Sequence, residues 1–544
     1  MHSLMMDTPL LISDLIRFAE RNHGDTEIVS KTVEGDLHRY TYRAAHGRAR
    51  KLAKVLQALG VKPAERVGTL AWNGYRHYEL YYAVSGMGAV INTINPRLFP
   101  DQIVYISNHA ENAALFFDLS FVPLVEKLAP QLNSVKHYVL MTDRAHMPAS
   151  SAIANLQCYE ELMARQDERY EWPRFDELTA AALCYTSGTT GNPKGVLFGN
   201  RSTVLHAYGA ALPDALTLSA RDSVLPVVPM FHANAWSLAY ACTMVGAKLV
   251  FPGPHLDGKS VYGLIEQEKV TLSAGVPTVW LMLLQHLGAN KLRFSTLERT
   301  VIGGAACPPA MIRSFQDDYG VTVFHAWGMT EMSPLGTVGS LKAKQLALDK
   351  EARYAVQAKQ GRGIFGVEMK IIDGQGKDLA WDGKRFGNLM VKGPWIASGY
   401  FKGEGGDPLK EGWFPTGDVA TIDPDGYMQI TDRSKDVIKS GGEWISSIEL
   451  ENIAVGHPAI AEAAVIGVHH PKWDERPIVV AIKKPGQEVT RDELLKFYEG
   501  KIARWWMPDD VVFVAELPHT ATGKLSKLTL RQQLKDYRHP EAAQ

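Results

Sequence analysis

Cysteine is scarce in this sequence, and neither sign of charge is in excess. Only 4 of the 544 residues are cysteine, and no two of them form a C-x-x-C pair. We therefore expect neither a disulfide framework nor a cysteine-based zinc site, and a reducing, cytoplasmic location is the simplest interpretation. The 58 Lys and Arg residues balance 59 Asp and Glu, giving a net charge of -1. This balance excludes a whole-molecule attraction to nucleic acid or anionic lipid.

The sequence also lacks a long uninterrupted apolar run. Its most apolar long window, residues 224–246, is broken by Pro226, Pro229, His232 and Asn234, so no membrane span is expected. The N-terminus has no basic stretch followed by an apolar run and a cleavage site, which argues against a targeting peptide. The hydrophobic share of 46% and the charged share of 22% are typical of a globular protein, and the length predicts several domains.

Short apolar runs alternate with longer periodic ones between about residues 183 and 328. This alternation predicts a mostly parallel sheet covered by helices. The first 110 residues show a weaker form of the same pattern, with a long apolar helix expected over 77–90. The runs that predict strands are 223–230, 247–252, 270–276, 299–305 and 321–327, and those that predict helices are 236–246, 259–269, 277–288 and 308–320.

The sequence pattern changes after about residue 360. Short strands separated by turn sequences rich in Asp and Gly predict a compact β-rich section up to about residue 431. Strand and helix patterns resume beyond residue 433 and predict a small α/β domain. The polar segment DRSKD, residues 432–436, is the best candidate for a hinge between the two parts.

The strongest local signal is the loop TSGTTGNPKG, residues 186–195, which lies between two apolar strand-like runs. Small residues let backbone N–H groups and hydroxyls approach oxyanions closely, and Lys194 adds a positive charge for phosphates. The alternative is an ordinary Gly-rich hairpin loop. The pattern differs from the P-loop of NTPases because Gly195, rather than Ser or Thr, follows the lysine, so a magnesium ligand must come from elsewhere.

This loop resembles the phosphate loop of the adenylate-forming (ANL) superfamily, and further signatures of that superfamily follow in order along nearly the whole chain. The resemblance implies the cosubstrates ATP and coenzyme A with Mg²⁺. Segment HAWGMTE, residues 325–331, resembles the one in which Trp327 lies by the adenine, Thr330 contacts the α-phosphate and Glu331 reaches the magnesium ion; an isolated Thr-Glu pair would otherwise be a solvated turn. Thr190 is implied as a second metal ligand. In chain order, the nucleotide-binding residues that the resemblance implies in this part of the sequence are Thr186, Ser187, Gly188, Thr189, Thr190, Gly191, Lys194, Gly304, Ala305, Ala306, His325, Ala326, Trp327 and Gly328.

Further resemblances lie toward the C-terminus. Asp418, in GWFPTGD, would accept hydrogen bonds from the ribose hydroxyls, and Arg433 would contact the same sugar. Lys435 would be the pivot between the domains, and Lys524, in TATGKLSK, matches the superfamily's catalytic lysine. The segment that would meet coenzyme A contributes Lys439, Gly441, Gly442 and Glu443.

The resemblance implies an α/β fold with a large N-terminal domain of stacked sheets and a small β-barrel-like section. It places this adenylation domain at residues 1–432 and a small mobile α/β cap at residues 433–544. Two other motifs are interpreted as structural. GRGIFG, residues 361–366, lacks the strand before it and helix after it that a dinucleotide site needs, so we expect a loop. TIDPDGYMQITD, residues 421–432, departs from a calcium loop and is expected to form a hairpin turn.

The segment PMFHANAW, residues 229–236, resembles the border of the superfamily's acyl pocket. It has no Asp to pair with a substrate ammonium, so an amino-acid substrate is disfavoured. His232, Trp236 and Gly303 would contact the acid, with Gly304, Ala305 and Ala306 leaving room beside Trp236. The alternative for His232 and Trp236 is ordinary packing.

The wording of six segments sharpens the resemblance: INPRLF, PMFHANAW, GGAACPPAMIRSF, AWGMTEMSP, KSGGEWISSIELE and WWMPDD. Together they resemble bacterial medium-chain fatty-acid–CoA ligases and 3-methylmercaptopropionate–CoA ligases, which the sequence does not separate. The implied reaction joins a short- to medium-chain carboxylic acid to the α-phosphate of ATP, releases pyrophosphate and then forms the CoA thioester with release of AMP. The competing interpretation is an adenylating enzyme that delivers its acyl group to a separate carrier protein. Relatives are often homodimers, so a homodimer is expected.

Overall fold

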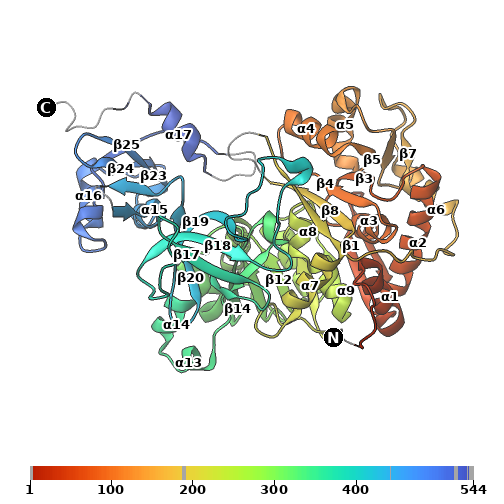
Figure 1. Cartoon of the computed structure of the whole chain (residues 1–544), viewed down its shortest axis with the longest axis horizontal. Helices are drawn as coiled ribbons and strands as arrows, with labels where there is room; N and C mark the ends of the chain where they lie inside the picture. Colours follow the sequence, from red (N-terminus) through yellow and green to blue (C-terminus); the bar gives the residue numbers. More distant parts are fainter. Residues whose placement is uncertain (1–3, 187–191, 441–442, 520–524, 536, 538–544) are drawn as a thin grey trace. The chain divides into compact units, whose positions relative to one another are not determined.

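The computed structural model describes residues 4–186, 192–440, 443–519, 525–535 and 537. The chain divides into two compact units (Figure 1). Unit 1 comprises the described residues up to 186, together with 192–368 and 392–414. Unit 2 comprises 369–391 and the described residues from 415 onward.

The first sheet of unit 1 has seven strands in the order β7-β6-β5-β3-β4-β8-β9. Its strands run parallel except at one edge, where β8 and β9 form an antiparallel hairpin. The residues are β3 Arg66–Leu70, β4 Val90–Thr93, β5 Asn112–Phe117, β6 His137–Leu140, β7 Gln157–Cys158, β8 Ala180–Tyr185 and β9 Gly195–Gly199.

The second sheet of unit 1 follows the order β16-β15-β14-β13-β12-β10-β11-β1-β2. Pairing is parallel from β14 to β1 and antiparallel at both ends. The residues are β1 Glu27–Lys31, β2 Leu37–Thr41, β10 Ser223–Pro226, β11 Lys248–Phe251, β12 Leu272–Gly275, β13 Arg299–Ile302, β14 Thr322–Gly328, β15 Leu335–Val338 and β16 Gly361–Gly363.

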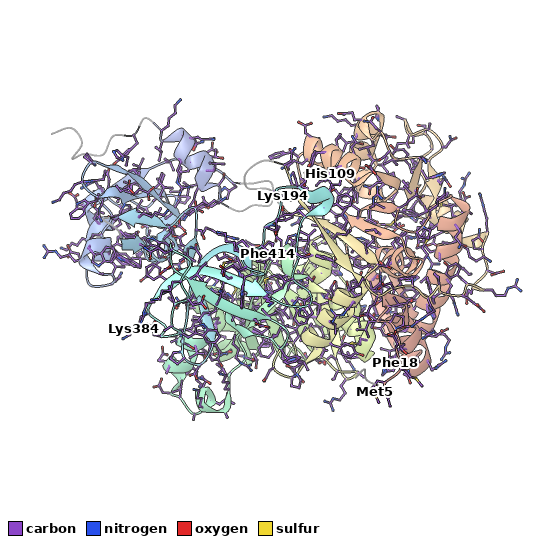
Figure 2. The ribbon with its side chains drawn as sticks, in the orientation of Figure 1. Met5, Phe18, His109, Lys194, Lys384 and Phe414 are labelled. Atoms are coloured by element: carbon purple, nitrogen blue, oxygen red, sulfur yellow. The ribbon has the colours of Figure 1, made fainter. Side chains whose placement is uncertain are left out.

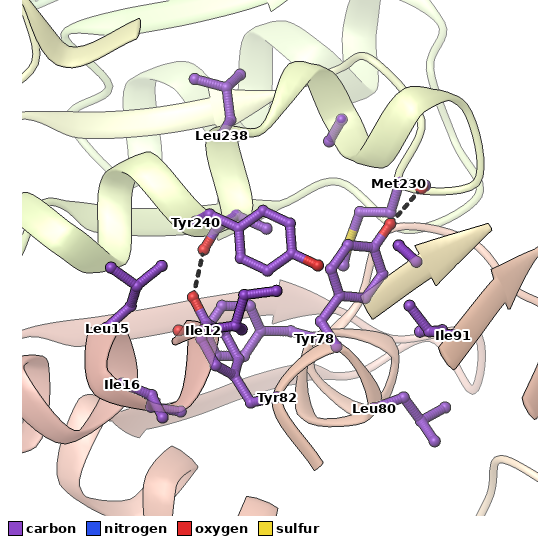
Figure 3. Close-up of a cluster of buried hydrophobic side chains, with 14 of the residues drawn as sticks. Ile12, Leu15, Ile16, Tyr78, Leu80, Tyr82, Ile91, Met230, Leu238 and Tyr240 are labelled. Atoms are coloured by element: carbon purple, nitrogen blue, oxygen red, sulfur yellow. Dashed lines mark hydrogen bonds between the residues drawn. The ribbon is translucent and has the colours of Figure 1, made fainter. Parts of the chain in front are cut away.

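Helices cover these two sheets and supply much of the core. All twelve residues of α3 are buried, and α1, α2 and α3 pack against one another. Figure 3 shows the tyrosines of α3 meeting α1 and α9, where the Tyr82 hydroxyl donates to the Ala239 carbonyl at 2.9 Å. The main helices of unit 1 are α1 Ile12–His23, α2 Tyr42–Ala58, α3 Tyr75–Gly86, α4 Pro100–Ala110, α7 Asn200–Ala211, α9 Leu238–Val245, α10 Gly258–Gln267, α11 Pro277–Asn290 and α14 Lys350–Gln357.

Unit 2 contains a strand series β17-β18-β19-β20 and a second small sheet, β22-β21-β24-β23, with β25 paired to β24. The helices over residues 447–455 and 491–498 pack on this second sheet around a separate hydrophobic cluster, and the helix over residues 527–533 contributes Leu530 to another cluster. The strands are β17 Glu368–Ile372, β18 Phe386–Lys392, β19 Phe414–Ile422, β20 Tyr427–Arg433, β21 Ile438–Ser440, β22 Glu443–Ile445, β23 Ile460–His470, β24 Asp474–Lys483 and β25 Asp510–Phe513; the helices are α15 Ser447–Val455, α16 Arg491–Tyr498 and α17 Lys527–Gln533.

These elements confirm the predicted α/β fold class with a small C-terminal domain. The five strands and the helices predicted between residues 223 and 320 are present, although α12, Pro309–Arg313, is followed by a wider turn over Ser314–Asp318. The 421–432 motif is the predicted hairpin, with Gly426 N–H donating to the Asp423 carbonyl at 2.8 Å. The prediction of a loop over 361–366 was partly wrong, since residues 361–363 form strand β16. This strand pairs with β15, which lies more than 20 residues earlier in the chain, so the local sequence does not indicate it. Among the helices in the described ranges, none has the length and apolar character needed to cross a bilayer.

Candidate active site

The Gly-rich loop connects β8 to β9 as a hairpin. Tyr185 pairs with Gly195 at the hairpin's end, and the Thr186 N–H donates to the Lys194 carbonyl at 2.9 Å. The Lys194 N–H in turn donates to the Thr186 hydroxyl at 3.2 Å. The two ends of the loop, Thr186 and Lys194, are therefore held together at the edge of the sheet. Ser187, Gly188, Thr189, Thr190 and Gly191 lie outside the described residues.

Lys194 and Glu331 both contact Tyr400. The Lys194 ammonium lies 4.8 Å from the centre of the Tyr400 ring, and the Tyr400 hydroxyl donates to a Glu331 carboxylate oxygen at 2.8 Å. Burial, followed by the nearby Glu331 charge, raises the pKa of Tyr400 well above its usual range. Figure 2 labels Lys194 and also His109, whose ring bonds the Tyr185 hydroxyl at the base of the same hairpin. The structure thus brings together two predicted site residues that are 137 positions apart in the chain.

Thr330 and Glu331 form a buried 3-10 turn after β14. Their exposed fractions are 8% and 7%, so they are not the solvated turn considered as the alternative. The Ala397 N–H donates to the Glu331 carbonyl at 2.7 Å, which fixes the backbone of the turn. An added Cβ at Gly328 would lie 2.0 Å from the Pro334 carbonyl oxygen, so only glycine fits where the chain leaves β14.

His325 lies inside β14, and backbone groups engage both of its ring nitrogens. Nδ1 donates to the Ala358 carbonyl at 3.0 Å, and Nε2 accepts the Cys307 N–H at 3.2 Å. Burial lowers its pKa to about 4. The neutral ring therefore links the backbone of Cys307 and of Ala358 to β14. Ala326 and Trp327 are also buried in this strand.

Trp236 packs against the glycines that follow β13. A Cβ added at Gly303 would lie 3.1 Å from the Trp236 ring, and one at Gly304 would lie 3.8 Å from it. His232, Gly304, Ala305 and Ala306 are exposed, whereas Trp236 is half-buried. The glycines therefore allow the Trp236 ring to lie close to the chain that follows β13, and the predicted acyl pocket stays a prediction.

The backbone around Trp236 is unusual. Five consecutive non-glycine residues, 233–237, have φ between 42° and 65°, a left-handed conformation that costs L-residues about 1–2 kcal/mol each. Asn73 anchors the chain just before this turn. Its amide donates to the Pro226 and Val228 carbonyls at 2.8 Å each and accepts the Met230 N–H at 2.6 Å.

The predicted ribose-binding residues meet in unit 2. Asp418 and Arg433 are opposite one another in the β19–β20 pair, and their side chains form an ion pair at 2.8 Å. Asp418 is 3% exposed, while half of the Arg433 side chain is exposed. The pair therefore presents a charged edge at the end of two strands.

The remaining C-terminal residues are placed as follows. Lys435 is exposed in the turn after β20, and Lys439 is exposed in β21, where its N–H donates to Glu475 at 2.9 Å. Glu443 begins β22 and pairs with Ser440. Gly441, Gly442 and Lys524 lie outside the described residues.

Comparison with known proteins matches residues 15–401 to the AMP-binding enzyme family and residues 449–524 to the AMP-binding enzyme C-terminal domain. The first match alone spans more than half of the chain. The chain belongs to the AMP-binding enzyme family. This confirms the predicted adenylate-forming relationship.

Curated members of the AMP-binding enzyme family match almost the whole chain. The 3-methylmercaptopropionyl-CoA ligase of Ruegeria lacuscaerulensis is 55% identical over 98% of each chain. The medium-chain-fatty-acid–CoA ligase of Ectopseudomonas oleovorans is 50% identical over 98% of this chain and 97% of its own. Among solved structures, an anthranilate CoA ligase in complex with anthranoyl-AMP is 26% identical, has a TM-score of 0.81 and is matched over 97% of this chain and 98% of its own.

Two residues of this AMP-binding enzyme were missed by the reasoning from sequence. Tyr400 lies in the segment SGYF, where a tyrosine next to a glycine gives no distinctive signal. Asn73 precedes Gly74, and an Asn-Gly pair predicts only a turn. Each residue is identified by partners more than 60 positions away in the chain.

Proposed function

We propose that the protein is an ATP-dependent, AMP-forming acyl-CoA ligase that acts on a short- to medium-chain carboxylic acid of the fatty-acid or 3-methylmercaptopropionate type. The observation that carries the proposal is the convergence of Lys194 and Glu331 on Tyr400 beside the hairpin loop. A cation and a carboxylate held together in this way suit a magnesium-bound polyphosphate. The activities named for the two curated relatives support the same reaction.

The first half-reaction is adenylation. The acid's carboxylate oxygen attacks the α-phosphorus of ATP, and the bond to the β-phosphate oxygen breaks, so pyrophosphate leaves. Lys194 would hold the leaving phosphates and Thr330 the α-phosphate, while Lys524 would neutralise charge that develops at the bond being made. In the second half-reaction the CoA thiol attacks the acyl carbon, its proton goes to solvent and AMP leaves.

Glu331 fits a magnesium ligand. Among the described residues, no three His, Cys, Asp or Glu side chains converge on one point. Magnesium instead commonly takes one or two carboxylates plus substrate phosphate oxygens, and Glu331, with Thr190, would complete such a set. When bound, the ion would neutralise negative charge on the phosphates.

The acyl pocket would accept an uncharged chain. Residues 224–237 contain no Asp or Glu, and Trp236 offers an aromatic wall beside Gly303. An aliphatic or thioether acid satisfies such a pocket, whereas an α-ammonium group would be left unpaired. The buried, free cysteines at 158, 184, 242 and 307 agree with a proposed cytoplasmic location. A homodimer remains a prediction that gel filtration tests.

The decisive experiment is a panel of carboxylic acids assayed for pyrophosphate release and CoA thioester. We expect hexanoate, octanoate and 3-methylmercaptopropionate to give both products, and their kcat/KM values to rank the two substrate types. Thioester formation only with amino or aryl acids would overturn the substrate assignment. Pyrophosphate without thioester would favour delivery to a carrier protein.

Glu331→Gln should abolish both products. The matched control is Glu351→Gln, because Glu351 is an exposed carboxylate paired with Arg313.

A further inference from the structure

The segment 395–405 bonds to two regions of unit 1: the turn that carries Thr330 and Glu331, and helix α4 with the residue that follows it. At its start, the Ser333 hydroxyl donates to the Trp395 carbonyl at 3.0 Å, and the Trp395 indole N–H donates to the Leu335 carbonyl at 3.2 Å. The Ala397 N–H reaches the Glu331 carbonyl at 2.7 Å. These bonds attach the segment to the turn that carries Thr330 and Glu331.

The other end of the segment is attached near the hairpin loop. Lys402 pairs with Glu111 at 2.6 Å, and the Tyr105 hydroxyl donates to Glu404 at 2.8 Å. Glu111 follows α4, and Tyr105 lies within it. The segment is therefore bonded to unit 1 on both sides of Tyr400.

Lys194 lies between two parts of this segment. The Tyr400 ring is 4.8 Å from its ammonium, and a Cβ added at Gly405 would lie 2.8 Å from the same nitrogen. Gly405 also has a φ of 75°, which favours glycine. A side chain at position 405 would therefore require the ammonium to shift from its position over the ring.

We propose that Tyr400 is a positioning residue that orients the Glu331 carboxylate through its hydroxyl and the Lys194 ammonium through its ring, so that both charges are in place before the magnesium complex of ATP arrives. This assignment rests on the proposed function. A carboxylate that already accepts one hydrogen bond keeps its other oxygen directed, and a cation over a ring face gains electrostatic attraction. Side chains that are already ordered lose less conformational entropy when the ligand binds.

The test separates the two contacts with two substitutions. Tyr400→Phe removes the hydroxyl and keeps the ring, so we expect the magnesium concentration for half-maximal adenylation to rise about tenfold, the scale of one hydrogen bond to a charged group. Tyr400→Leu also removes the ring, so its KM for ATP should exceed that of Tyr400→Phe even at saturating magnesium. The kcat of Tyr400→Phe at saturating magnesium and ATP should stay within about twofold of the parent, since the phenylalanine ring still supports Lys194.

A binding measurement complements the kinetics. Calorimetric titration with α,β-methylene-ATP, which cannot donate its adenylyl group because a methylene replaces the α,β-bridging oxygen, measures nucleotide affinity at low and high magnesium without the acid or CoA. We expect the Tyr400→Phe affinity to fall about tenfold at low magnesium and to recover at high magnesium. This binding result stands even if the parent protein gives no thioester, so failure of the proposed function and failure of this assignment are distinguishable.

Tyr354 offers a matched control within unit 1. Its hydroxyl donates to Asp317, and the Arg313 guanidinium lies 4.6 Å from its ring centre, so Tyr354→Phe removes the same kind of bond away from the hairpin loop. It should leave the magnesium requirement unchanged. If Tyr400→Phe lowers the melting temperature as much as Tyr354→Phe does and leaves the magnesium requirement and nucleotide affinity unchanged, Tyr400 is only structural and the assignment is overturned.

Discussion

His325 illustrates how a single buried residue supports the nucleotide-binding strand. Its neutral ring joins β14 to the backbone of Cys307 and Ala358. Because burial lowers its pKa from 6.5 to about 4, the unfolded chain binds more protons than the folded chain between these pH values. Stability is therefore lost as the pH falls from about 6.5 toward 4, by about 3 kcal/mol for this one group.

We expect His325→Gln to weaken the pH dependence of thermal unfolding between pH 7 and pH 5, because glutamine does not titrate. Four other histidines, at 38, 46, 77 and 206, also have pKa values that burial lowers, so the dependence should shrink rather than vanish. Differential scanning calorimetry at several pH values measures it. His255→Gln, at an exposed position, is the control, and an identical slope in the parent and the His325 variant would contradict the argument.

At the scale of elements, Asn73 connects the loop before α3 to the chain that leaves β10. It makes three hydrogen bonds to the backbone of residues 226–230, and this backbone leads directly into the segment with His232 and Trp236. We expect Asn73→Ala to raise the KM for the carboxylic acid several-fold and to leave the KM for ATP within about twofold. The reason is that an unsatisfied buried backbone group costs about 1–3 kcal/mol and the loop will move to avoid it.

Asn200 is a matched control for this prediction. It is fully buried and also bonds backbone at both ends of its amide, accepting the Ile12 N–H and donating to the Thr179 carbonyl. Asn200→Ala should lower the melting temperature without changing the KM for the acid. Equal changes of the two KM values in the Asn73 variant would show that the bonds support general folding rather than the acyl pocket.

Elements were predicted well where their signal is local. Apolar runs with flanking turns identify β10 to β14, and the Asp-Pro-Asp-Gly sequence identifies the β19–β20 hairpin. The position of the Lys194 hairpin also follows from the strands on either side of its loop. Tyr400 and Asn73 could not be predicted, because their partners, side chains for Tyr400 and backbone groups for Asn73, are distant in sequence and come near only in the folded chain. The left-handed turn at 233–237 has no glycine to indicate it.

At the scale of the whole molecule, the predicted boundary at 432/433 lies within unit 2. Contacts across this boundary are close: the Ser446 hydroxyl bonds the Thr431 carbonyl, and the Ser447 N–H donates to the Asp432 carboxylate at 2.5 Å. Burial raises the pKa of Asp432, while nearby Lys527 opposes this rise. The rotation predicted at Lys435 would have to break these contacts.

Lys435→Pro tests this rotation. Lys435 is the third residue of a turn in which the Asp436 N–H donates to the Arg433 carbonyl at 2.9 Å, and proline there fixes φ and restricts Ser434. We expect thioester formation from preformed acyl-adenylate to slow at least tenfold and pyrophosphate release in single-turnover assays to change less. Lys435→Ala removes the side chain but keeps the torsion free, so it should retain both steps. Equal losses in both half-reactions would contradict a pivot at Lys435, because a blocked rotation must affect the step that depends on it.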